Sequence, residues 1–154
     1  MAPEKQVLFH IGEEVYGIDI VYVQGIEKYV NIIPVPNAPS YIEGIINLRG
    51  EIIPVFSLRD KFGLPKIPPT EMTKLLITKA QDVIVGFEVD AVSEIVELAE
   101  DDILEAPPMI KTAATGYVGA VANVKDKLVI LLDLDGILSD AEKESLQGIL
   151  EEHE

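Results

Sequence analysis

Few residues in this sequence have both the type and the spacing that chemistry requires. Asp133 and Asp135 follow the apolar run Leu128–Leu132, so two carboxylates stand at the end of a predicted strand. The two histidines, His10 and His153, have no neighbour at the spacing of a metal site or a catalytic triad. The chain has no cysteine and no glycine-rich loop followed by Lys-Ser or Lys-Thr, which excludes disulfides, thiolate metal sites and a nucleotide phosphate loop. The aspartate pair is therefore the main candidate for catalysis, and we otherwise predict no metal and no cofactor.

The run Leu128–Gly136 resembles the first motif of the haloacid-dehalogenase-type phosphatases. In those enzymes the first aspartate is the nucleophile, the second is the acid/base and both serve Mg²⁺, which would give these roles to Asp133 and Asp135. That fold needs further strands and catalytic residues downstream, whereas 18 residues follow Gly136. The same run aligns with Phe56–Asp60 in an internal repeat, and this second copy has no paired carboxylates. Both observations disfavour a Mg²⁺-dependent phosphatase, which stays as the enzymatic alternative.

The two arginines, Arg49 and Arg59, occur in or beside one predicted hairpin. The apolar runs Ile45–Leu48 and Ile52–Phe56 flank a polar tip, where Gly50 can adopt the positive φ that a tight reversal needs. A guanidinium offers a rigid fork of donors that suits interfaces. Arg49 at the tip has no role in a core, and we predict that it contacts a partner.

Composition limits the classes of function. The 154 residues are 48% hydrophobic and 25% charged, which is typical of a globular protein. The net charge of −15 repels phosphate backbones and anionic lipids, so we expect no nucleic-acid partner. No apolar run approaches the roughly 18–20 residues that span a membrane, so we expect no membrane insertion. The lack of cysteine makes a cytoplasmic location the default expectation.

Short apolar runs separated by turn residues predict an all-β fold. Besides the central hairpin, the expected strands are Val7–Ile11, Val15–Ile20, Val23–Val30, Lys74–Thr78, Val83–Val89, Ser93–Leu98, Tyr117–Val124 and Leu128–Leu132. Ser57–Phe62 is expected to form one helical turn, and Lys66–Thr70 is the best internal boundary. From Ser139 onward, apolar residues at helical spacing predict a short acidic C-terminal helix over residues 139–154.

The chain repeats itself. Tyr41–Leu58 aligns without gaps on Tyr117–Leu134, an offset of 76 residues, and Gly17–Ile26 aligns on Gly86–Ile95, an offset of 69. Two matches in the same order indicate two copies of a five-strand unit. We therefore predict two small packed barrels, with approximate boundaries at residues 6–68 and 70–138, within a single domain.

Several stretches point to a known family: Glu14–Ile20, Ile33–Pro36, Gly44–Leu58 and Val85–Val92. Together they resemble the CheW family, the coupling proteins of bacterial chemotaxis. The resemblance runs from about Gln6 to Leu138, and Glu43–Val55 is its most specific part. It implies a pair of five-stranded SH3-like barrels, in agreement with the repeat.

The resemblance also implies a non-enzymatic adaptor. Its expected partners are the cytoplasmic tip of a methyl-accepting chemoreceptor and the regulatory domain of the histidine kinase CheA, at membrane-bound receptor arrays. A generic SH3-like adaptor for proline-rich peptides is the other binding alternative. Such grooves need clustered aromatics, whereas this chain has no tryptophan, and its five tyrosines and four phenylalanines are scattered.

The family's contact positions can be carried over residue by residue. Kinase contact through an apolar face of the first barrel would involve Val23, Gly44 and Ile46. Receptor contact through the groove between the barrels would involve Arg49, Leu75, Gly86 and Ile95. For the apolar members core packing is the competing explanation, and for the two glycines it is backbone geometry.

Overall fold

The computed structural model describes residues 4–80, 82–104 and 118–138, and it is built almost entirely of strands. The strands are β1 (Glu4–Ile11), β2 (Glu14–Asp19), β3 (Val23–Lys28), β4 (Ile42–Leu48), β5 (Glu51–Ser57), β6 (Lys74–Ala80), β7 (Val83–Val89), β8 (Ala91–Leu98), β9 (Ile103–Leu104), β10 (Val118–Val124) and β11 (Lys127–Leu132). Four short helical turns complete the described chain: η1 (Ile20–Tyr22), α1 (Leu58–Lys61), η2 (Glu100–Asp102) and α2 (Leu134–Ile137). The predicted all-β class is confirmed, and the helix expected over residues 139–154 lies outside the described residues.

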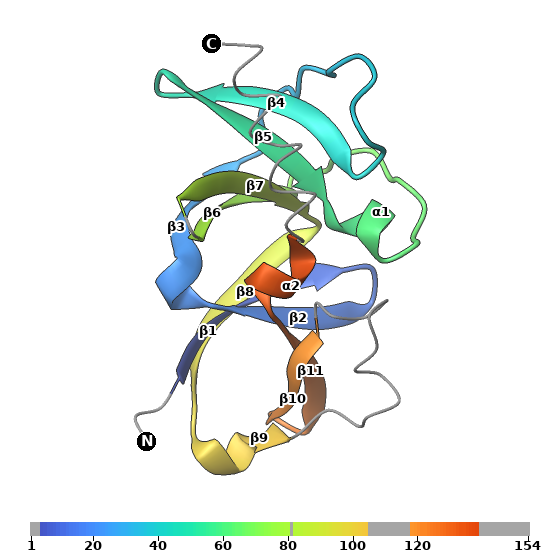
Figure 1. Ribbon diagram of the computed structural model, residues 1–154. Coiled ribbons are helices and arrows are strands. Elements are labelled where there is room, and N and C mark those ends of the chain that lie inside the picture. The colour runs from blue at the N-terminus through green and yellow to red at the C-terminus, as the bar shows by residue number, and fades with distance from the viewer. Residues whose placement is uncertain (1–3, 81, 105–117, 139–154) are drawn as a thin grey trace.

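The strands form two sheets, one above the other in Figure 1. The upper sheet has the order β3-β6-β7-β5-β4, and the lower sheet has the order β8-β1-β2-β11-β10-β9. The helices in the described part of the chain are too short to cross a membrane.

The two sheets do not follow the expected boundaries at 6–68 and 70–138. β1 and β2 belong to the first expected unit, but they pair with β8 and β11 of the second. Likewise, β6 and β7 belong to the second unit, but they pair with β3 and β5 of the first. The division into consecutive barrels is therefore corrected to an exchange of strands between the two repeats. An internal alignment identifies equivalent strands, but it does not determine which copy each strand pairs with.

The repeat itself is confirmed element by element. Adding 76 to the residue numbers of β4 and α1 gives those of β10 and α2. Each of these helical turns begins at a side-chain cap, since Ser57 accepts a hydrogen bond from the Asp60 amide and Asp133 accepts one from the Asp135 amide. The parallel pairs between the repeats also correspond, with Val55 opposite Gly86 in the upper sheet and Leu131 opposite Gly17 in the lower.

The buried apolar residues in the described part of the chain form three clusters. The largest cluster joins the two sheets and includes Phe9, Phe56 and Phe87, with Phe56 and Phe87 in edge-to-face contact at 5.5 Å between ring centroids. A second cluster includes Ile46, Val55 and Leu75 of the upper sheet, and a third includes Leu8, Val129 and Leu131 of the lower sheet. The surface outside these clusters is what remains for partners.

Candidate partner-docking site

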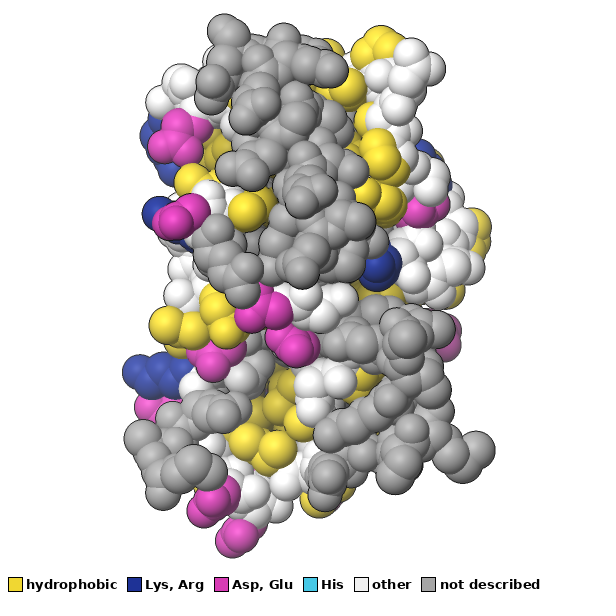
Figure 2. Space-filling model, viewed as in Figure 1, with side chains coloured by type: hydrophobic (Ala, Val, Ile, Leu, Met, Phe, Trp, Pro, Cys, Tyr) yellow, Lys and Arg dark blue, Asp and Glu magenta, His cyan; other side chains and the backbone are white. Residues whose placement is uncertain are grey.

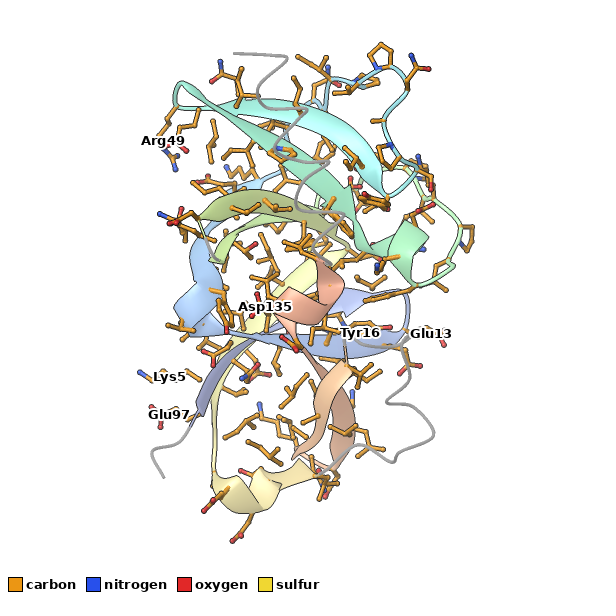
Figure 3. The ribbon with its side chains drawn as sticks, in the orientation of Figure 1. Lys5, Glu13, Tyr16, Arg49, Glu97 and Asp135 are labelled. Carbon is orange, nitrogen blue, oxygen red and sulfur yellow. The ribbon has the colours of Figure 1, made fainter. Side chains whose placement is uncertain are left out.

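The tip of the β4–β5 hairpin presents Arg49 to solvent. Both tip residues have positive φ, 50° at Arg49 and 89° at Gly50, and the Gly50 amide donates to Asn47 Oδ1 at 2.9 Å. This geometry turns the chain within two residues, and Figure 3 shows Arg49 at the free end of the hairpin. The Arg49 side chain is 74% exposed, which agrees with the prediction that it has no core role.

Arg49 has one acidic partner, Glu27 of β3, which sequence reasoning missed. Arg49 Nη2 donates to Glu27 Oε1 at 2.9 Å, and the Glu27 side chain is 26% exposed. The pair joins the tip of the hairpin to the opposite edge strand of the same sheet. An exposed pair of this kind contributes about 0–1 kcal/mol, so it orients the guanidinium more than it stabilises the fold. The only sequence signal for Glu27 is the alternation of exposed and half-buried residues along β3. That alternation does not identify Arg49 as its partner.

The second repeat contains a similar arrangement. Lys125 is the residue equivalent to Arg49, has a φ of 52°, and donates through Nζ to Glu94 of β8 at 3.2 Å. Its side chain is as exposed as that of Arg49. The two hairpin tips therefore differ chiefly in the donor they present, a planar guanidinium in one and a point-like ammonium in the other.

The three predicted kinase-contact residues lie in different environments. Val23 is half-buried at the start of the edge strand β3 and packs against the cluster between the sheets. Gly44 is buried at a close approach of two backbones, since a Cβ there would lie 2.1 Å from the carbonyl oxygen of Ile33. Ile46 is only 2% exposed and lies in the apolar cluster of the upper sheet. This burial agrees with core packing, the competing explanation, and the kinase contact of Ile46 stays a prediction.

The predicted receptor-contact residues are also separated. Leu75 is fully buried and belongs to the same upper cluster as Ile46, which agrees with core packing, and its receptor contact stays a prediction. Gly86 is buried on β7, where a Cβ would lie 3.3 Å from Ile77. Ile95 is 53% exposed on β8, an edge strand of the lower sheet. Arg49 and Ile95 therefore offer side chains from different sheets.

A clamp between the sheets was not predicted. Asp90, between β7 and β8, accepts hydrogen bonds from Arg59 Nε at 3.2 Å, from Arg59 Nη2 and from the Gly12 amide at 2.7 Å. Burial raises the pKa of Asp90, but the hydrogen bonds and charge of Arg59 and the Gly12 amide outweigh it and hold this pKa below its usual value. Through Asp90, Arg59 thus connects the end of the upper hairpin to the β1–β2 turn. The second arginine therefore has a structural role.

Exposed apolar side chains lie on and around β3, an edge strand of the upper sheet. Val21 in η1 is strongly exposed, and Ile26 and Val30 are exposed on and just after β3. On the face seen in Figure 2, hydrophobic side chains reach the surface in both halves of the molecule, and acidic side chains lie near their junction. Ile26 directly precedes Glu27, the partner of Arg49, and exposed apolar groups together with an arginine are typical of protein–protein interfaces.

Comparisons with known proteins agree with this geometry. Residues 5–142 match the family model of the CheW-like domain. The chain belongs to the CheW family. It is 33% identical to the chemotaxis protein CheW of Klebsiella aerogenes over 97% of this chain and 90% of that one. It is 30% identical to the chemotaxis protein CheW of Bacillus subtilis over 94% of this chain and 91% of that one.

A solved CheW structure has the same fold. The crystal structure of the scaffolding protein TtCheW from Thermoanaerobacter tengcongensis matches with a TM-score of 0.80 and 35% identity, over 92% of each chain. The CheW fold is a pair of SH3-like barrels, and the family consists of non-catalytic chemotaxis scaffolds. The present chain is accordingly a chemotaxis scaffold and not an enzyme. Asp133, the first residue of the phosphatase-like pair, has instead the structural role of capping α2.

Proposed function

We propose that this CheW-family scaffold couples the cytoplasmic tip of a chemoreceptor to the regulatory domain of the histidine kinase CheA. The observation that carries the proposal is Arg49, a largely exposed guanidinium at the tip of a hairpin. The resemblance to the family assigns receptor contact to this position. Among the described residues, the 2.9 Å pair of Arg49 with Glu27 engages one of its nitrogens, Nη2, and a guanidinium has further donors for a partner. The protein acts in the cytoplasm and is recruited to membrane-bound receptors through this contact.

The kinase would bind another face of the same molecule. Val23 is half-buried at the start of an edge strand, and the exposed apolar residues Val21 and Ile26 lie within three positions of it in the chain. An edge strand with exposed apolar side chains can accept a partner strand or an apolar surface. Gly44 and Gly86 support the two faces through backbone geometry, and Ile95 extends the receptor face onto the lower sheet.

Reconstitution tests this proposal. A scaffold without catalytic groups acts only by positioning its partners, so with the kinase alone it should barely change autophosphorylation. With receptor present in a membrane or nanodisc, it should raise autophosphorylation strongly. Stimulation of the kinase to the same degree without receptor would refute the coupling role.

A further inference from the structure

A cavity of about 240 Å³ lies at the base of the β4–β5 hairpin, the end from which α1 continues in Figure 1. Its lining includes Glu43 near the start of β4 and Ser57 at the end of β5. Arg49 stands at the other end of this hairpin, six positions from Glu43, which corresponds to about 20 Å of strand. The cavity is therefore not part of the surface around Arg49.

Two carboxylates line this cavity from the strands on either side of β5. Glu43 belongs to β4 and Glu88 belongs to β7, and both strands pair with β5. Ser57 of β5 is directly opposite Glu88 in the ladder and is only 2% exposed. Both glutamates are half-buried, so two acidic groups share a site that water reaches only in part.

The two cations that line the cavity do not pair with these glutamates. Arg59 donates to Asp90 through Nε at 3.2 Å and through Nη2, and its Nη1 donates to the Pro65 carbonyl at 3.0 Å. Lys66 is exposed. In the described part of the chain neither glutamate has a cation at ion-pair distance. The site therefore has two acids and no cation in contact with them.

The electrostatic cost of this arrangement falls on Glu88. Burial chiefly, and then the neighbouring carboxyl of Glu43 and the charge of Asp90, raise the pKa of Glu88 to about 8, while the charge of Lys66 opposes the shift. A cation placed between the two glutamates would displace the proton of Glu88 and remove the repulsion between the carboxylates. The cavity thus favours a positive group that comes from outside it.

Apolar side chains form the rest of the cavity and the chain around it. Tyr29, Ile32 and Pro68 are among the lining residues. Of the ten large hydrophobic side chains that are exposed in the described part of the chain, four either line the cavity or directly adjoin a lining residue in sequence: Val30, Ile33, Ile67 and Met72. Exposed apolar groups around a polar pocket are typical of protein–protein interfaces, and an apolar wall suits the methylene stem of a charged side chain.

The acidic pair is not a requirement of the fold. In the other repeat the residue equivalent to Glu43 is Gly119, and the residue equivalent to Glu88 is Asp19. Asp19 has a different role, since it accepts a hydrogen bond from the Val21 amide and caps η1. The same strand arrangement therefore forms without two glutamates in one cavity.

We propose that this cavity binds a lysine side chain of a partner polypeptide, with its ammonium group between Glu43 and Glu88 and its stem against Tyr29 and Ile32. An ammonium has three donors that can serve two separate carboxylates, whereas the planar fork of arginine matches a single one. The residues beside this lysine in the partner are apolar, to cover the exposed hydrophobic side chains around the cavity. The inference does not depend on the proposed contact between Arg49 and a receptor.

The first experiment uses two peptides that differ by one charge. Acetyl-isoleucyl-lysyl-isoleucine amide and its norleucine analogue are titrated into the full chain at pH 8, near the pKa of Glu88, and isoleucine methyl shifts are followed by NMR. The lysine peptide should give saturable shifts at Ile32 and Ile67, with Ile95 of the lower sheet unmoved, and the norleucine peptide should bind about tenfold more weakly or worse. Equal affinity of the two peptides, or no saturable shift at Ile32 and Ile67, would overturn the proposal.

The second experiment removes one carboxylate at a time. Glu43→Gln and Glu88→Gln keep the shape of the lining, and each should weaken the lysine peptide by about tenfold while the norleucine peptide binds as before. Glu13→Gln, in the exposed β1–β2 turn, changes the net charge equally and should behave as wild type. Affinity for the lysine peptide within about twofold of wild type in either folded variant would sink the idea. If neither variant folds, the two peptides on wild type decide.

Discussion

Replacing Arg49 with glutamate should separate the receptor from the kinase. In the free protein the substitution removes the 2.9 Å hydrogen bond to Glu27 and places two carboxylates near each other. Because the Arg49 side chain is 74% exposed, solvent screens this change, and the free energy of unfolding should fall by about 1 kcal/mol or less. If Arg49 binds a receptor helix as proposed, its guanidinium is partly desolvated there, and losing it should cost roughly 2–5 kcal/mol, at least a thirtyfold loss of affinity.

The repeat supplies a matched control. Lys125→Glu reverses a charge at the equivalent tip position, with similar exposure, a positive φ and an acidic partner at 3.2 Å. It should leave receptor affinity unchanged. Arg49→Asn is a second control, because asparagine tolerates the left-handed backbone and so removes the guanidinium without adding strain.

The assay is titration of a soluble receptor cytoplasmic fragment, and separately of the CheA regulatory domain, into each variant at moderate salt. Receptor binding should be lost in Arg49→Glu and weakened in Arg49→Asn, with kinase affinity and melting temperature close to wild type in both. Receptor affinity in Arg49→Glu within threefold of wild type would remove this residue from the site. Loss of both partners together would instead point to a change in the fold.

Four further predictions concern the rest of the molecule. Val23→Asp, which puts a charge on a half-buried edge position, should abolish kinase binding while the receptor still binds, and a fall in melting temperature with kinase affinity intact would make Val23 a core residue only. Gly44→Ala should destabilise the fold by on the order of 2–4 kcal/mol in urea, since its Cβ meets the Ile33 carbonyl, whereas Gly25→Ala, with its nearest contact at 3.5 Å, should be nearly neutral. The pKa of Glu88 is raised from 4.5 to about 8, so the protonated Glu88 stabilises the fold fully below about pH 4.5, and this stabilisation is lost as the pH rises through about 8. The free energy of unfolding in urea should therefore fall between pH 4.5 and pH 8 in wild type, and it should fall less in Glu88→Gln. The lowered pKa of Asp90 acts in the opposite direction, so Asp90→Asn should weaken the fall in stability on acidification below the ordinary aspartate range.

Features that depend on neighbouring residues could be read from the sequence alone. Alternating apolar residues and turn glycines determine the hairpins, and Gly50 marks the tip that exposes Arg49. Repetition of the same local pattern at an offset of 76 residues determines that β4–β5–α1 and β10–β11–α2 are equivalent. These features are local because backbone conformation and hydrophobic periodicity are set within a few residues.

Only the tertiary structure decided which repeat each strand joins, and with it which side chains remain at the surface. Ile46 and Leu75 have the same apolar character as Ile95, yet the first two are enclosed in the upper sheet and Ile95 stands on an edge. The Arg59–Asp90 clamp likewise joins residues 31 positions apart, and Glu43 and Glu88, which are 45 positions apart, line the same cavity. Side chains of one chemical type are sorted into core, clamp and docking surface by long-range packing, which no local pattern encodes.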